Sequence, residues 1–369
     1  MLFKYGKVVT GKFFYDRKEM QKKVLSFVQS GQSFMLKAPR RYGKTSLVKH
    51  VMGSSDIEYF YIDFRKTPRL ELFNDMLMDF IYSNMGIKGA LAQIKDNAIA
   101  FIRNHKTTIK VDFSIFEASV EFYADKKISQ EDRMVRALDL AQSVAKSLNK
   151  KLYVFMDEFQ DVKKLSSDFD ILELMRGAMQ HHDDVCYIFA GSHMTIMTAV
   201  FENKKSPFYN FCRKLKLEAF DKEELSSELQ ASFKTRSLAF ESDELLYGLL
   251  DRLKGHPANT MLVMLIIESM AIEKQVLVIK QELIEDAYTE AMEEMGDLIA
   301  EYLKEIKTKE HLHDVIYRMA NGEDQVLESS SLLQKKKYLV DMGYLLQVGR
   351  GDYKIIDGFL EEDLKNYNI

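Results

Sequence analysis

Residues 38–45 read Ala-Pro-Arg-Arg-Tyr-Gly-Lys-Thr and directly follow the apolar residues Phe-Met-Leu at 34–36. An apolar run that enters a loop ending in Gly-Lys-Thr, followed by a helix, is the layout of a phosphate-binding loop. Gly43 lets the backbone curl so that successive N–H groups point at phosphate oxygens, and Lys44 supplies a cation for the β- and γ-phosphates. Thr45 offers a hydroxyl to Mg²⁺, and the helix that starts there turns its positive end to the anion.

The usual pattern of such a loop begins with glycine, and this chain has Ala38 there. The loop geometry is kept if that position needs only a small side chain. Arg40 and Arg41 would face the phosphates or a neighbouring subunit, or stay in solvent. We expect the nucleotide to contact the loop and the first turn of the helix: Ala38, Pro39, Arg40, Arg41, Tyr42, Gly43, Lys44, Thr45 and Ser46.

A second chemical signal follows at residues 152–158, where five apolar residues end in Asp157 and Glu158. This pattern suits a buried parallel strand with carboxylates at its C-terminal edge, where ligands bind in open α/β sheets. The alternative is a strand that ends in solvated acids. Beside a phosphate loop, we expect Asp157 to serve the Mg²⁺ shell with Thr45, and Glu158 to be the catalytic carboxylate that orients water, together with Lys44.

Bulk composition describes an ordinary globular protein of two or three domains. The 369 residues are 46% hydrophobic and 29% charged, with a net charge of −4, which gives no general attraction to nucleic acid. The longest apolar run, at 261–267, is too short to cross a bilayer and is stopped by Glu268. Two cysteines and an N-terminus interspersed with lysines argue against a disulfide framework and a secretory signal, so we expect a cytoplasmic protein. The histidines show no metal-like spacing, and no structural metal is expected.

The first 220 residues alternate between strand and helix patterns, which predicts a parallel sheet covered on both faces. Strands are expected at 33–36, 58–64, 152–156, 185–190 and 215–217. The clearest helix is 129–148, where Ser129 and Asp132 are spaced as a capping box. Residues 109–122 alternate in polarity, which predicts a β-hairpin insertion at about 108–123.

The pattern changes twice further on. From residue 221, helices are expected at 223–232, 243–253 and 259–272, which we assign to a helical lid domain at 221–295. Residues 296–369 suggest helices at 311–319 and 332–342 and then a tight hairpin of strands 344–348 and 353–356, the pattern of a winged-helix domain.

Several single residues are further site candidates. Ser192 or His193, at the end of the strand at 185–190, would touch the γ-phosphate or the attacking water, or form only a strand-end turn. Arg213 would act as a charge sensor or remain a solvated surface arginine. Residues 13–17, Phe-Phe-Tyr-Asp-Arg, would wall the adenine ring or anchor the chain in a hydrophobic core.

The lysines at 335–337 lie on the helix that would read DNA in a winged module. However, residues 296–369 contain ten Lys/Arg and fourteen Asp/Glu, a net charge of −4, which is the wrong sign for a DNA reader. An interaction or regulatory role for this module is favoured over DNA binding.

Five segments together resemble the archaeal-type P-loop ATPases of the STAND/AAA+ group. They are residues 14–19, the loop at 39–47, Asp-Glu-Phe-Gln at 157–160, Ala-Gly-Ser at 190–192 with Ser-Pro-Phe-Tyr at 206–209, and Gly-His-Pro at 255–257. The resemblance implies a five-stranded parallel core with the acid-bearing strand beside the phosphate-loop strand, a helical lid and a winged-helix tail. It also implies ATP with Mg²⁺, Pro257 near the base or ribose, and motion of lid against core. Residues 209–213 lack the paired arginines often found there, and Ala38 replaces the usual glycine.

The sequence therefore predicts an α/β P-loop NTPase with the additional nucleotide contacts Arg17, Ser192 and Pro257. The expected function is that of an ATP-binding and ATP-hydrolysing switch or remodelling ATPase, working with a protein partner or as an assembly of copies. One alternative is a DNA-associated ATPase that uses the winged module. Another is a nucleotide-binding signalling module that hydrolyses little ATP.

Overall fold

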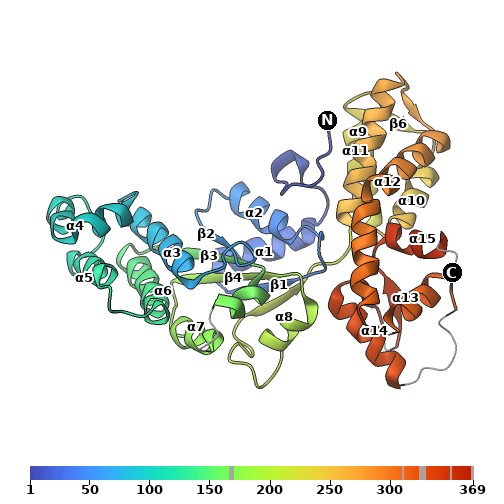
Figure 1. Ribbon diagram of the computed structural model, residues 1–369. Coiled ribbons are helices and arrows are strands. Elements are labelled where there is room, and N and C mark those ends of the chain that lie inside the picture. Colours follow the sequence, from blue (N-terminus) through green and yellow to red (C-terminus); the bar gives the residue numbers. More distant parts are fainter. Residues whose placement is uncertain (166–169, 310, 324–329, 350, 367–369) are drawn as a thin grey trace.

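A five-stranded parallel sheet forms the centre of the molecule (Figure 1). The computed structural model describes residues 1–165, 170–309, 311–323, 330–349 and 351–366. The strands are β1 (Phe34–Lys37), β2 (Phe60–Asp63), β3 (Leu152–Asp157), β4 (Val185–Gly191) and β5 (Arg213–Lys216), in the spatial order β2-β3-β4-β1-β5. All neighbouring strands are parallel, so the expected parallel core is confirmed.

The prediction that the acid-bearing strand lies beside the phosphate-loop strand is wrong. β1 pairs with β4 and β5, whereas the acid-bearing β3 pairs with β2 and β4. All seven residues of β4 are buried, as suits a strand at the middle of a sheet covered on both sides. The strand order therefore places β4 between β1, which leads into the phosphate loop, and β3, which ends in the acids.

The sheet separates two hydrophobic layers, because successive side chains of a strand point to opposite faces. Phe34 and Leu36 of β1 pack with α1 (Lys18–Ser30) and α2 (Lys44–Ser54) on one face. Met35 belongs to the other layer, which is built from these helices: α3 (Leu70–Asn84), α6 (Gln130–Ser147), α7 (Ile171–Met179) and α8 (Met194–Phe201). The Ser129 side chain caps α6 by accepting a hydrogen bond from Asp132 N, as the spacing predicted.

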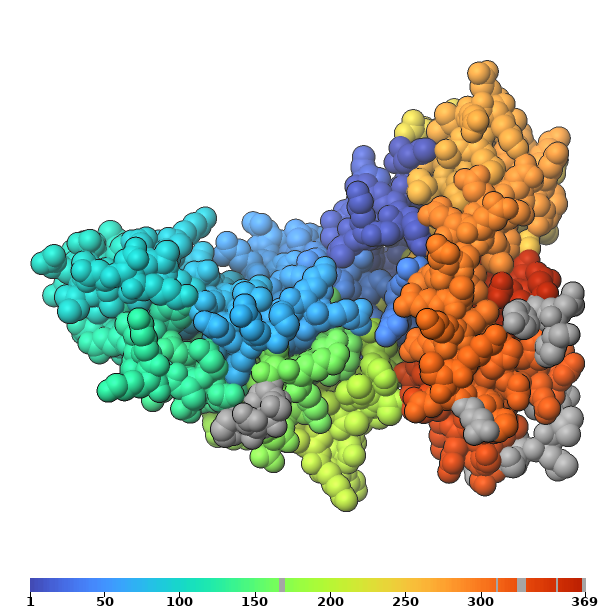
Figure 2. Space-filling model, in the orientation of Figure 1, coloured from blue at the N-terminus to red at the C-terminus, as the bar shows by residue number. Residues whose placement is uncertain are grey.

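The segment expected to be a β-hairpin at 108–123 is helical instead. It contains α5 (Phe113–Ala124), which packs with α4 (Ala90–His105). Asp112 caps α5 by accepting from Ser114 N, and Phe116, Val120 and Tyr123 bury one helical face. The apolar residues repeat at a spacing of three to four, and this period outweighs the short alternation before them. Together α4 and α5 form an arm that extends away from the C-terminal half (Figures 1 and 2).

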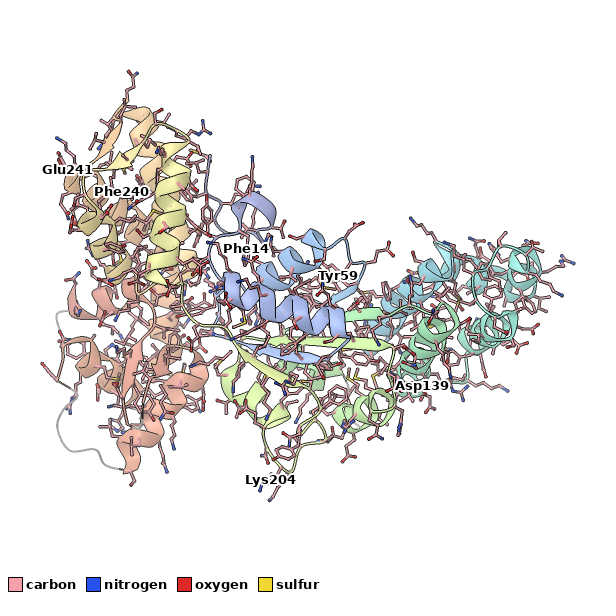
Figure 3. All side chains as sticks on the ribbon, turned by 180° about the vertical axis from the view of Figure 1, so that it is seen from behind. Phe14, Tyr59, Asp139, Lys204, Phe240 and Glu241 are labelled. Carbon is pink, nitrogen blue, oxygen red and sulfur yellow. The ribbon has the colours of Figure 1, made fainter. Side chains whose placement is uncertain are left out.

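Helices dominate after Asp221, as expected. α9 (Lys222–Lys234), α10 (Asp243–Arg252) and α11 (Pro257–Glu273), here called the lid, are followed by the long α12 (Gln281–Lys307). Two-residue strands β6 (Ala239–Phe240) and β7 (Val278–Ile279) pair at the outer end of the lid, near the labelled Phe240 in Figure 3. The expected domain boundary between residues 295 and 296 lies inside the continuous helix α12.

The C-terminal elements, here called the tail, are α13 (Leu312–Ala320), α14 (Ser330–Met342), the antiparallel pair β8 (Leu345–Gln347) and β9 (Tyr353–Ile355), and α15 (Gly358–Asn366). Arg252 of the lid forms ion pairs of 2.7 Å with Glu362 of α15 and Glu285 of α12. The tail is therefore fixed on the lid, while its assignment as a winged helix remains a prediction. Among the described residues, no helix is long and apolar enough to span a membrane.

Candidate nucleotide site

The phosphate loop occupies the turn between β1 and α2. Gly43 has φ +77° and precedes Lys44, the first residue of α2. A Cβ at Gly43 would lie 3.3 Å from the Arg17 guanidinium, so both the conformation and the space favour glycine. Ala38 is completely buried, which fits the expectation that its position needs only a small side chain. The N–H groups at the start of α2 are thus available to an anion.

Lys44 lies beneath this loop. Its ammonium donates hydrogen bonds of 3.0 Å to the carbonyls of Ala38 and Pro39, and its side chain is almost completely buried. Burial lowers the pKa of Lys44 to about 8, although the carboxylates of Glu158 and Asp157 act in the opposite direction. The loop therefore holds a poised cation next to its own backbone.

The predicted metal residues are in direct contact. Thr45 Oγ1 donates a hydrogen bond of 2.6 Å to Asp157 Oδ2, and the Tyr61 hydroxyl donates to the same oxygen at 3.2 Å. Burial raises the pKa of Asp157, partly offset by the Thr45 hydrogen bond. No group of three or more His, Cys, Asp or Glu in the described part of the chain has a metal-binding arrangement. One carboxylate and one hydroxyl suit Mg²⁺, which takes few protein ligands and fills its shell with water and phosphate oxygens.

Glu158 adopts a left-handed backbone conformation, with φ +50°, directly after β3. Its carboxylate accepts hydrogen bonds from Gln160 and from Ser192 Oγ, the latter at 2.6 Å, and pairs with the Arg65 guanidinium at 3.0 Å. Burial by itself would raise the pKa of Glu158. The hydrogen bonds and the charges of Lys44 and Arg65 outweigh it, so the pKa lies below its usual value and the group is ionised at neutral pH.

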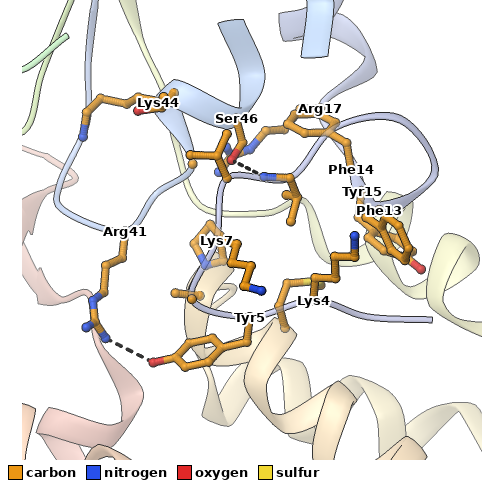
Figure 4. Close-up of a pocket in the computed structure, with 18 of the residues that line it drawn as sticks. Lys4, Tyr5, Lys7, Phe13, Phe14, Tyr15, Arg17, Arg41, Lys44 and Ser46 are labelled. Carbon is orange, nitrogen blue, oxygen red and sulfur yellow. Dashed lines mark hydrogen bonds between the residues drawn. The ribbon is translucent and has the colours of Figure 1, made fainter. Parts of the chain in front are cut away.

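A cavity of about 390 Å³ opens beside the loop (Figure 4). Gly43, Lys44, Thr45, Ser46 and Glu158 line one part of it. The aromatic residues Phe13, Phe14 and Tyr15 and the lid residues Pro257 and Met261 line another part. The sequence candidates for base binding and phosphate binding therefore face one common space between core and lid.

Arg17 lines the same cavity, but its hydrogen bonds go to the protein. It donates to the carbonyl of Tyr42 at 2.6 Å and to that of Glu218 at 3.0 Å, and its guanidinium lies over the Phe220 ring. Burial lowers the pKa of Arg17 to about 10. This side chain joins the phosphate loop to the segment that leads into the lid.

The two loop arginines face α12. Arg41 lies 3.7 Å from the Met295 sulfur of that helix and donates to the Tyr5 hydroxyl at 3.3 Å. Arg40 lies 4.0 Å from Glu305 of α12. Both line a second cavity of about 250 Å³, which also contains Glu158 and Tyr302.

The remaining candidates divide in two. Ser192 belongs to the site because it donates a hydrogen bond to Glu158. His193 occupies the N-cap position of α8, but its side chain makes no capping hydrogen bond. Arg213 lies opposite Phe34 at the N-terminal end of the parallel sheet, away from the loop, with its guanidinium over Phe27. The structure favours the interpretation of Arg213 as a surface arginine.

Sequence analysis missed Tyr61 and Arg65, which follow one another closely at the end of β2, and also residues 4–9, which line the cavity. Tyr61 and Arg65 were detectable in principle, since parallel strands bring their C-terminal ends to one edge. Residues 4–9 carry no local motif.

A loop between a parallel strand and a helix, with two acids at the end of another strand of the same sheet, defines the fold of a P-loop NTPase. No protein-family model and no curated protein sequence matches the chain. Solved structures do match. The Walker-type ATPase PABY2304 of Pyrococcus abyssi is 18% identical, with a TM-score of 0.66 over 99% of this chain and 100% of that chain.

The ORC2 protein of Aeropyrum pernix, in its ADPNP-ADP complexes, is 13% identical, with a TM-score of 0.53 over 95% of this chain and 91% of that chain. At such identities the likeness establishes the fold. The chain thus has an α/β P-loop NTPase core with C-terminal helical elements, as predicted.

Proposed function

We propose that this protein binds ATP with Mg²⁺ at the phosphate loop and hydrolyses it as a switch or remodelling ATPase. The observation that carries the proposal is the convergence of Lys44, the Thr45–Asp157 pair and Glu158 on one site. The choice of ATP is supported by the resemblance in sequence and by similar structures that are a Walker-type ATPase and an ADPNP-ADP complex.

Each residue has a distinct task in this proposal. Lys44 and the N–H groups of the loop bind the β- and γ-phosphates, and Thr45 with Asp157 holds the metal. When bound, Mg²⁺ neutralises charge on the phosphate oxygens. Glu158 is ionised and accepts hydrogen bonds, so it is suited to orient water or take its proton. Ser192, Gln160 and Arg65 hold that carboxylate in place.

The switch part of the proposal is supported by a buried cluster between loop, lid and tail. The Tyr42 ring meets the His256 ring edge-on, with centroids 5.1 Å apart, and His256 is the N-cap of the lid helix α11. Asn259 of that helix donates a hydrogen bond of 2.8 Å to Asp357, which caps α15 of the tail. A movement of the phosphate loop would therefore be transmitted to both the lid and the tail.

Purified protein should bind Mg·ATP, and Lys44→Ala should weaken binding by about 10- to 100-fold, the range for losing a hydrogen bond to a charged group. Lys23→Ala, an exposed lysine of α1, is the matched control. Equal ATP affinity of wild type and a folded Lys44→Ala protein would refute the proposal. A bound but unhydrolysed ATP would favour the nucleotide-binding signalling module instead.

A further inference from the structure

The N-terminal segment, residues 2–9, runs between the lid and the phosphate-loop helix and is here called the strap. At its lid end, Leu2 N donates a hydrogen bond of 2.6 Å to the buried carboxylate of Glu268. Phe3 is 1% exposed and packs against Phe233 of α9, with ring centroids 5.1 Å apart. Figure 2 shows the dark-blue N-terminal segment lying against the yellow and orange lid.

The other end of the strap is tied to the core. Val9 N donates a hydrogen bond of 3.1 Å to the hydroxyl of Ser46, which lies in the first turn of α2. In between, the Tyr5 hydroxyl accepts from Arg41 of the phosphate loop and lies 3.0 Å from the sulfur of Met295 in α12. Three points of attachment hold the strap as one wall of the 390 Å³ cavity.

The strap carries two lysines that line this cavity, Lys4 and Lys7. The Lys4 ammonium lies 3.8 Å from the centroid of the Phe13 ring, so its charge already has an aromatic partner. Lys7 follows Gly6, whose φ of +71° turns the strap at this point. In Figure 4 the Lys7 side chain extends into the space between Ser46 and Tyr5.

The contacts of the other charged residues in the cavity leave Lys7 available to bind an anion. Three other cations that line the cavity already donate to protein groups. Lys44 donates to the carbonyls of its own loop, and Arg17 donates to those of Tyr42 and Glu218. Arg41 donates to the Tyr5 hydroxyl. Among the described residues that line the cavity, Glu158 is the one carboxylate, and it is paired with Arg65. An anion in this space gains a charge-assisted hydrogen bond from a lysine that the fold delivers there. Because the strap is held at three points, its backbone loses little further conformational entropy on binding, and the cost is confined to the exposed Lys7 side chain.

We propose that Lys7 is a phosphate-binding residue of this site, supplied by the strap from outside the phosphate loop. The ligand class is a nucleoside di- or triphosphate, and the inference rests on the proposed function. Lys7 adds affinity through the charge of the phosphates and not through the base. The strap thereby makes binding depend on its attachment to both lid and core.

The test compares Lys7→Met, which keeps an unbranched apolar side chain without the charge, with Lys12→Met, an exposed lysine outside the cavity. Calorimetry gives the affinity for Mg·ATP and Mg·ADP, and competition gives the affinity for adenosine. We expect Lys7→Met to weaken ATP and ADP binding about 5- to 30-fold and leave adenosine unchanged. Lys12→Met should match the wild type, and Lys7→Arg should retain most of the affinity.

The outcomes separate the two proposals. If wild type binds ATP and folded Lys7→Met binds it equally well, the role of Lys7 is refuted and the proposed function stands. An equal loss for ATP and adenosine also refutes it, since the strap would then act only as a wall. If wild type binds no nucleotide, the proposed function fails and this inference fails with it.

Discussion

Thr45 and Asp157, 112 residues apart in the chain, are joined by a hydrogen bond of 2.6 Å. Thr45 lies in the first turn of α2 and Asp157 ends β3, although β4 separates β3 from β1 in the sheet. The helix after the loop thus reaches across a strand to meet the acid. This contact joins the two halves of the site that the sequence presents far apart.

The Thr45–Asp157 contact predicts how Mg²⁺ dependence is lost. Asp157→Asn should remove most of the gain in ATP affinity that Mg²⁺ gives. Tyr61→Phe deletes only the hydroxyl that supports Asp157 and should weaken Mg²⁺ binding by about tenfold, as expected for a hydrogen-bond partner of a metal ligand. Tyr59→Phe, at the residue directly before β2, is the control. Titrating Mg²⁺ at fixed ATP measures the effect, and identical curves for Tyr61→Phe and Tyr59→Phe would contradict it.

Lys44 predicts a pH dependence. Its pKa of about 8 means that the ammonium is present below pH 8 and is lost as pH rises through that value. Bound phosphate favours the charged form and raises the pKa, so binding takes up a proton in this range. ATP affinity should be nearly constant from pH 6.5 to 7.5 and fall by up to about tenfold per unit above 8. Calorimetry between pH 6.5 and 9.5 tests this, and constant affinity to pH 9.5 would rule it out.

Much of the fold follows from local signals. The apolar runs that become β1, β3 and β4 are bounded by loop residues, and the cap at Ser129 marks the start of α6. The loop and the acids were likewise predictable, because their chemistry requires certain residue types at fixed spacing.

The errors involve information that is not local. Strand order depends on packing over the whole sheet, so the position of β4 between β1 and β3 cannot be derived from either strand's sequence. The arm segment contains both a short alternation of apolar and polar residues and an apolar repeat of helical period. The helix α5 forms because it buries Phe116 against neighbouring helices. Arg65 reaches Glu158 only because β2 and β3 are adjacent.

The tail predicts weak binding to duplex DNA. Lys336, the middle residue of the lysine run, is 3% exposed and lies 5.6 Å from the Tyr353 ring, so it is not presented to a phosphate backbone. The net charge of −4 over residues 296–369 also opposes DNA. The full chain should show no nanomolar binding at physiological salt by fluorescence anisotropy. Nanomolar affinity with a steep salt dependence, lost in Lys337→Ala, would overturn this and favour a DNA-associated ATPase.

The separate partners of Asp157 and Glu158 predict that a change at Glu158 slows hydrolysis without removing ATP binding. Asp157 and Glu158 are consecutive, and their carboxylates serve different partners: Thr45 and Tyr61 for the first, Ser192, Gln160 and Arg65 for the second. Glu158→Gln keeps size and shape but loses the charge that accepts a proton. It should leave ATP affinity within a few-fold and slow single-turnover hydrolysis by about 100-fold or more, the usual range for a positioned general base.

Arg65→Met tests whether the pairing also sets the activity of Glu158. Removing the guanidinium takes away one of the charges that lower the pKa of Glu158, so this pKa should rise. Since the wild-type carboxylate is ionised at neutral pH, the acidic limb of the hydrolysis profile should move to higher pH in Arg65→Met, while ATP affinity changes little. Arg69→Met, on the same connection after β2, is the control. Single-turnover rates are measured from pH 5 to 8. Superimposable profiles for wild type and Arg65→Met would show that the ion pair does not set the pKa of Glu158. Hydrolysis at the wild-type rate by Glu158→Gln would show that Glu158 is not the catalytic carboxylate.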